Sequence, residues 1–277
     1  MTGVIDVGGG NRGAFGAGVL DYCLDHGIVF DYCIGVSAGS ANCASYIAGQ
    51  RGRNLRFYTK YNISREAVSI RNGLRNHSML NLDYIFRTVS DEDGEDPLNY
   101  EAFARSGQIC KIVTTDAQTG NPVFFDKQDV RKNDYGVLSA SCNLPVVNRA
   151  YIFRGREYYD GGLSDPIPVR YAFDDGCDKV VAILTLPKDY FRSSQDDKRA
   201  ARLLRAYPKI RERIINRASL YNRELEELLR LEKQGKVLII APHAKADMDT
   251  LGKNKAVIES LYREGYQSAE KILDFLK

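Results

Sequence analysis

Residues 32–48 read YCIGVSAGSANCASYIA, and this stretch decides the fold. The apolar run 32–35 predicts a buried strand, and the small residues of 38–48 predict a helix that follows it at once. Gly35-Val36-Ser37-Ala38-Gly39 joins the two. A serine on such a sharp turn takes strained backbone angles, which neighbours without bulky side chains relieve, and its hydroxyl is exposed at a helix N-terminus.

The same alternation of short apolar runs and longer helical patterns continues along the chain. It predicts the α/β class, with parallel strands joined by crossover helices. The predicted strands are 4–7, 32–35, 109–115, 179–186 and 236–241, and the predicted helices are 14–25, 38–48, 130–141 and 255–276. Two further runs lie beside glycines and are expected as short antiparallel strands at a sheet edge, namely 122–125 and 151–154.

The composition is that of an ordinary globular protein, with 277 residues of which 44% are hydrophobic and 27% charged. This length and the few prolines favour one domain over residues 1–277. No secretory signal pattern opens the sequence, and no apolar run approaches the ~20 residues of a membrane span. The cysteines are scattered without a C-x-x-C pair, so we expect a cytoplasmic protein with reduced thiols at Cys23, Cys33, Cys43, Cys110, Cys142 and Cys177.

A second glycine-rich loop, Gly8-Gly9-Gly10-Asn11-Arg12-Gly13, also lies between a predicted strand and a predicted helix. Consecutive glycines let backbone N–H groups gather around an anionic atom. The anionic atom belongs either to a nucleotide phosphate or to the oxyanion of an attacked ester. The loop lacks the Gly-Lys-Ser/Thr ending of a phosphate-binding loop and the later acid of a dinucleotide site. Because parallel strands end at the same edge of a sheet, this loop and Ser37 are expected to face one site.

A third motif, Asp160-Gly161-Gly162, follows the short apolar run that ends in Tyr158-Tyr159. The three motifs in this order, with Ser-Ala-Ser-Cys-Asn-Leu-Pro at 139–145, resemble the patatin-like phospholipase family over roughly residues 3–170. The resemblance implies a three-layer α/β fold, in which a mostly parallel central sheet is flanked by helices. It also implies hydrolysis of carboxylic esters of phospholipids or related acyl esters, without a cofactor or a metal.

By this resemblance Ser37 is the nucleophile and Asp160 accepts its proton. The backbone amides of Gly9, Gly10 and Ala38 would form the oxyanion hole, and Arg12 would steady the glycine loop. The supporting motif positions are Gly8, Asn11, Arg12, Gly13, Gly35, Gly39, Gly161 and Gly162. A carboxylate is a weak base in water, but in a dry cleft against the hydroxyl it can take the proton as the ester is attacked. The oxyanion hole then supplies the main gain, at ~3–4 kcal/mol per donor.

Several alternatives use other residues. Ser37, an acid and His243 occur in the order of an α/β-hydrolase triad. Such enzymes place several strands ahead of the nucleophile, whereas here only one predicted strand precedes the strand that leads into Ser37. His26 and His77 are expected at the surface. The acidic run 91–96 does not match a calcium loop and is expected to be solvated. A non-catalytic lipid- or acyl-binding protein and a nucleotide-binding regulator remain as further hypotheses.

A basic helical segment spans about 188–236, with fourteen basic and eight acidic residues, and Pro208 interrupts it. Within it, 198–217 holds eight basic residues and one acid, interleaved with leucine and isoleucine. A solvated helical face is one interpretation. Contact with anionic membrane surfaces is the other, since each basic residue near such a surface contributes ~1 kcal/mol. Nucleic acid is not expected, because few aromatic residues are available to stack on bases.

Overall fold

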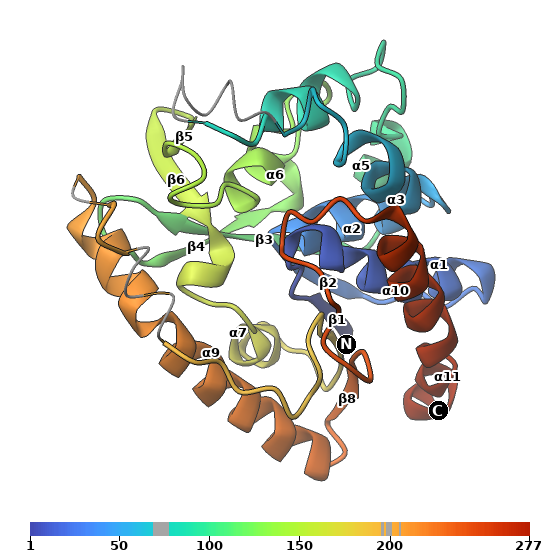
Figure 1. Ribbon diagram of the computed structural model, residues 1–277. Helices are drawn as coiled ribbons and strands as arrows, with labels where there is room; N and C mark the ends of the chain where they lie inside the picture. Colours follow the sequence, from blue (N-terminus) through green and yellow to red (C-terminus); the bar gives the residue numbers. More distant parts are fainter. Residues whose placement is uncertain (69–77, 195–196, 198–200, 205) are drawn as a thin grey trace.

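The computed structural model describes residues 1–68, 78–194, 197, 201–204 and 206–277 (Figure 1). Within these residues an eight-stranded sheet has the order β5-β6-β3-β2-β1-β7-β8, and β4 also pairs with β3. The strands are β1 (Thr2–Asp6), β2 (Tyr32–Val36), β3 (Ile109–Asp116), β4 (Pro122–Asp126), β5 (Tyr151–Phe153), β6 (Arg156–Asp160), β7 (Lys179–Ile183) and β8 (Val237–Ile240). The pairs among β3, β2, β1, β7 and β8 are parallel, while β4, β5 and β6 pair antiparallel.

Helices cover both faces of the sheet, which gives three layers (Figure 1). Val4 of β1 belongs to the core under α1 (Ala14–Asp25), α2 (Ala38–Ile47) and α10 (Lys255–Ser268), whereas Ile5 belongs to the core under α7 (Val169–Asp174) and α9 (Pro208–Lys233). Successive strand residues point to opposite faces, so both faces are apolar and both are buried. The predicted fold class is confirmed.

The shorter helical elements surround these layers. They are α3 (Arg53–Arg56), α5 (Tyr100–Arg105), α6 (Gly136–Ser141), α11 (Lys271–Leu276), the 3-10 turns Gly10–Gly13, Lys127–Asp129 and Gly161–Leu163, and the π-helical turns Phe57–Tyr61 and Tyr84–Thr88. None of the helices in the described ranges is both long and apolar enough to cross a bilayer. The single-domain expectation stays a prediction, and His77 lies outside the described residues.

Two of the predicted helices are wrong in their extent. The helix expected at 130–141 begins only at Gly136, because Asp126 and Asp129 cap a separate 3-10 turn and Asn133 takes a left-handed φ of 57°. The helix expected at 255–276 is two helices, since α10 ends at Ser268 and α11 starts at Lys271. The strand predictions agree with the structure to within a few residues at each end.

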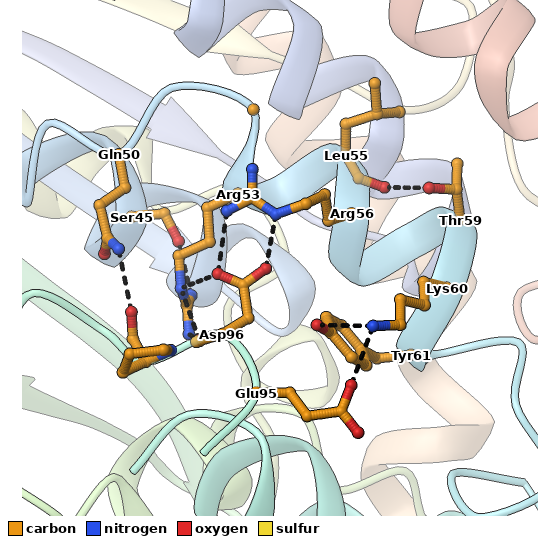
Figure 2. Close-up of polar contacts among 12 residues, drawn as sticks. Ser45, Gln50, Arg53, Leu55, Arg56, Thr59, Lys60, Tyr61, Glu95 and Asp96 are labelled. Atoms are coloured by element: carbon orange, nitrogen blue, oxygen red, sulfur yellow. Dashed lines mark hydrogen bonds and ion pairs between the residues drawn. The ribbon is translucent and has the colours of Figure 1, made fainter. Parts of the chain in front are cut away.

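The acidic run 91–96 corrects another expectation, because Asp96 is not solvated but 6% exposed. Its carboxylate lies between two arginines (Figure 2). Arg56 donates to both carboxylate oxygens at 2.6 and 2.9 Å, and Arg53 Nε lies 3.7 Å from Oδ1. Arg53 also donates to the hydroxyls of Ser45 and Ser90, so this buried guanidinium is held on several sides. The cluster ties the loop after Tyr84–Thr88 to α3.

We expect Asp96→Ala to destabilise the fold by ~3 kcal/mol, because it leaves the buried Arg53 guanidinium without its countercharge. Chemical denaturation monitored by circular dichroism measures this loss. Asp93→Ala is the matched control, since Asp93 is exposed in the same loop and should change stability by no more than ~0.5 kcal/mol. Equal stability of the two variants would contradict a structural role for the buried cluster.

Candidate active site

Strand register brings Ser37 and Asp160 together. Val36, the last residue of β2, pairs with Val113 of β3, and the next β3 residue, Thr114, pairs with Asp160 of β6. Thr114 also pairs with β4, which therefore occupies the other edge of β3. Strands β2 and β6 therefore pair with the same edge of β3, one after the other. Asp160, the last residue of β6, lies just beyond the end of β2. Ser37 and Asp160 line one cavity of about 540 Å³.

Ser37 stands between β2 and α2 with φ 56° and ψ −131°, a conformation that costs a non-glycine residue of the order of 1–3 kcal/mol. The turn is held by hydrogen bonds. Ser37 N donates to Ser141 Oγ at 2.9 Å, and Ser40 Oγ donates to Ser37 O at 2.7 Å. A Cβ atom on Gly39 would lie 2.0 Å from the carbonyl oxygen of Asp6, and one on Gly35 would lie 2.3 Å from Ser40 Cα. The two glycines therefore let the helix approach the sheet closely.

The loop after β1 lies beside this turn. Gly8, Gly9 and Gly10 all have positive φ, at 63°, 124° and 60°. A Cβ on Gly8 would lie 2.7 Å from the amide nitrogen of Gly39, so this backbone packs directly against the start of α2. Thr185 Oγ1 donates to Gly8 O from the end of β7. The glycine loop and Ser37 therefore face one site, as the ends of adjacent parallel strands should.

Asp160 is 3% exposed, and only one of its carboxylate oxygens is used. Oδ1 accepts a 2.8 Å hydrogen bond from Gly162 N, whereas Oδ2 is buried with no partner among the described residues. Burial raises the pKa of this carboxyl, while the Ser37 hydroxyl, the Gly162 amide and the charges of Arg217 and Arg192 lower it. The result is a dry carboxylate with one oxygen available to a neighbouring proton donor.

An apolar cavity of about 840 Å³ opens from the other side of Ser37. Its lining is predominantly aliphatic and aromatic, and includes Ala41, Phe57, Leu82, Phe86, Leu138 and Cys142. Gly10, Asn11, Ser37 and Ala38 also line it, as do further polar residues such as Arg53, Asn54 and Ser90. Such a cavity suits a hydrocarbon chain whose polar end reaches the serine.

The comparisons with known proteins agree with this geometry. A family model described as patatin-like phospholipase matches residues 7–173, which hold all three motifs. The chain belongs to the patatin-like phospholipase family. A second model, for a domain of unknown function (DUF6363), matches residues 207–277.

Two individual proteins resemble this member of the patatin-like family. The uncharacterized protein YjjU of Escherichia coli (strain K12) is 31% identical over 202 residues, which make up 71% of this chain and 55% of that protein. The chain thus spans about half the length of this curated relative. The crystal structure of VipD from Legionella pneumophila has a TM-score of 0.48 at 12% identity, over 99% of this chain and 66% of that one.

Other sequence-predicted residues lie as follows. Asn11 Nδ2 donates to Gly252 O, so Asn11 links the patatin-like glycine loop to the C-terminal segment. Arg12 is 8% exposed and lines the cavity beside Ser37, but its Nε has no partner among the described residues. His243 is exposed, and its Nδ1 lies 2.8 Å from Glu264 Oε1. His26 Nδ1 contacts Tyr22 O on α1.

The sequence did not predict the buried residues that hold the glycine loop and Ser37 in position. Asp6 is fully buried, accepts hydrogen bonds from Gly8 N and from Asn42 Nδ2, and burial raises its pKa to about 6. Ser141 Oγ holds the amide of Ser37 and donates to Val113 O. An acid at the end of an otherwise apolar strand was a readable signal for Asp6. Ser141 gave none, because its role depends on how α6 packs.

We expect Gly39→Ala to unfold the turn or to destabilise the fold by more than about 3 kcal/mol, because the added methyl group overlaps the backbone of Asp6. Thermal and urea denaturation measure the change. Gly107→Ala is the control, since a Cβ there meets no atom within 4 Å and the position has no positive φ. A Gly39→Ala protein as stable as the control would contradict the close packing of α2 on β1.

Proposed function

We propose that this chain hydrolyses carboxylic ester bonds of lipids through an acyl-enzyme on Ser37, with Asp160 as the base. The observation that carries the proposal is the buried Oδ2 of Asp160, which has no partner among the described residues. It lies beside Ser37, which also lines the apolar cavity. Membership of the patatin-like phospholipase family supports lipid acyl hydrolysis in general. The Ser37–Asp160 dyad and the oxyanion hole go beyond this general activity and are part of the proposal.

The first half-reaction forms the acyl-enzyme. Ser37 Oγ attacks the ester carbonyl carbon, and its proton passes to Asp160 Oδ2. The carbonyl oxygen becomes an oxyanion, which the backbone amides of Gly9, Gly10 and Ala38 stabilise. Ala38 begins α2 and Gly10 begins its 3-10 turn, so neither amide has a partner inside its helix. Collapse of the intermediate expels the alcohol, which takes the proton from Asp160.

The second half-reaction restores the serine. A water molecule attacks the acyl carbonyl as Asp160 accepts its proton, and the same amides stabilise the second oxyanion. Breaking the acyl–Oγ bond returns the proton to Ser37 and releases the carboxylic acid. No histidine is required. His243 lines neither cavity at Ser37, and its ring is engaged with Glu264.

We expect Ser37→Ala and Asp160→Asn each to lower kcat for ester hydrolysis by about 10³-fold or more, because both act in one proton-transfer unit. The double variant should be no slower than either single variant. Initial rates with a short-chain chromogenic ester measure this.

The control for these variants is His243→Ala, which should keep most of the wild-type rate. Circular dichroism checks that every variant is folded. Multiplicative losses in the double variant, or a His243→Ala rate as low as that of Ser37→Ala, would contradict the dyad.

We also propose a cytoplasmic location with peripheral contact between the N-terminal part of α9 and anionic lipid. Ile210, Ile214 and Ala218 are buried, so the apolar stripe of this helix packs mainly on its own core. The outward side still presents charge, with Arg211 exposed, and Leu203 is 71% exposed beside Arg202. These features support a weak, salt-sensitive contact. Three further basic residues of this segment, Lys198, Arg199 and Arg205, lie outside the described residues.

We expect the wild-type chain to sediment with anionic vesicles at low salt and to be released at high salt, because the attraction is electrostatic. Removing two charges by Arg202→Gln with Arg211→Gln should weaken this binding severalfold. The matched control removes two exposed charges elsewhere, by Arg263→Gln on α10 with Lys271→Gln on α11. An equal loss of vesicle binding in both double variants would overturn the proposed membrane contact. Wild-type binding to zwitterionic vesicles that equals its binding to anionic vesicles would overturn it as well.

A further inference from the structure

Three arginines converge on the cavity that Ser37 and Asp160 line. Arg12 lies in the glycine loop, Arg192 follows β7, and Arg217 lies on α9. Arg192 and Arg217 lie beyond the residues that match the patatin-like model. The C-terminal part of the chain therefore brings two positive charges to the site that the N-terminal part builds.

Contacts with α9 hold Arg192 beside the cavity. Asn222 of α9 receives a hydrogen bond from Arg192 N at 2.7 Å and donates to Arg192 O at 3.1 Å. The Arg192 guanidinium lies 4.9 Å from the ring centroid of Tyr221, which also lines the cavity. Arg217 and Tyr221 are four residues apart on α9 and so share one face of it. The two C-terminal arginines are thus held by one side of one helix.

The positive charges are close enough to affect one another. Burial lowers the pKa of Arg12, and the charge of Arg217 lowers it further. Burial likewise lowers the pKa of Arg192 to about 10, with Arg217 the next cause and Arg12 a smaller one. The Nε atoms of Arg12 and of Arg217 are buried without a partner among the described residues. Bringing partly buried guanidiniums together is costly, and an anion that supplies the missing hydrogen bonds and charge offsets that cost.

The acidic groups nearby do not fill that role. The charge of Asp249 raises the pKa of Arg12, that of Asp197 raises the pKa of Arg192, and Asp160 lines the same cavity. In the part of the chain that the structure describes, no ion pair joins an acid to Arg12, Arg192 or Arg217. A planar guanidinium donates two parallel hydrogen bonds to a phosphate, so a phosphate is an anion that such a cluster suits.

We propose that Arg12, Arg192 and Arg217 bind the phosphate of a phosphate-bearing acyl ester while Ser37 attacks its acyl carbonyl. This deepens the proposed hydrolase function and rests on it. The apolar cavity takes the acyl chain, the cationic cavity takes the head group, and Ser37 lies where the two meet. The substrate class is therefore an acylated glycerol phosphate or a related phospholipid, in preference to a neutral glyceride.

The test compares two esters with the same acyl chain, a monoacylglycerol phosphate and the neutral monoacylglycerol, both below their critical micelle concentrations. The readout is the ratio of their kcat/KM values. We expect a ratio of about ten or more for the wild type and a fall of about tenfold in Arg217→Gln, since a charged hydrogen bond to phosphate is lost. Arg217→Lys should lie between, because it keeps the charge without the planar fork.

Arg223→Gln is the matched control, since Arg223 is exposed on the same helix and lines neither cavity at Ser37. It should leave the ratio unchanged. A wild-type ratio near one, or the same ratio in the wild type and Arg217→Gln, would overturn the head-group site.

Calorimetry with glycerol 3-phosphate and with inorganic phosphate separates this inference from the hydrolase proposal. Binding of glycerol 3-phosphate that is lost in Arg217→Gln supports the phosphate site even if neither ester is hydrolysed, a result that would contradict the hydrolase alone. Tighter binding of inorganic phosphate than of glycerol 3-phosphate would overturn a lipid head group as the ligand. No binding of either compound would overturn the site itself.

Discussion

The close approach of α2 to β1 is the constraint on which the site depends. Gly39 lies so near the carbonyl of Asp6 that no side chain fits, and this contact turns the chain sharply at Ser37. The left-handed backbone there is unfavourable for serine and persists only because the surroundings fix it. Asp6 contributes twice, since its carboxylate also accepts the amide of Gly8. One buried acid thus links the strand end, the glycine loop and the start of the helix.

The C-terminal third of the chain packs on the glycine loop and borders the cavity that contains Ser37 and Asp160. Thr250 O accepts the amide of Asn11, and a Cβ on Gly10 would lie 2.2 Å from the same oxygen, so this segment packs on the glycine loop. The face of α9 that holds Arg217 borders the cavity next to Asp160. The patatin-like match ends at residue 173, yet Arg217 and Arg192 beyond it also lower the pKa of Asp160.

Local patterns were enough to predict the sheet strands and the position of Ser37, because apolar runs and glycine spacing are readable without tertiary structure. The side-by-side placement of Ser37 and Asp160 needed the register of β6 on β3, which the sequence does not display. The acidic run around Asp96 was misjudged for a similar reason. Its buried partner Arg53 lies more than forty residues earlier, and only packing shows that the two meet. The cluster of Arg12, Arg192 and Arg217 was not predicted for the same reason, because these residues are far apart in the sequence and meet only in the folded chain.

The central claim is that Ser37 is an activated nucleophile with Asp160 as its base. Labelling the purified chain with a fluorophosphonate, followed by mass-spectrometric mapping of the modified peptide, tests it most directly, since only an activated serine reacts. The account predicts modification at Ser37 and a strongly reduced labelling rate when Asp160 is replaced by Asn. An unlabelled Ser37 in folded protein, or a labelling rate that does not depend on Asp160, would contradict it.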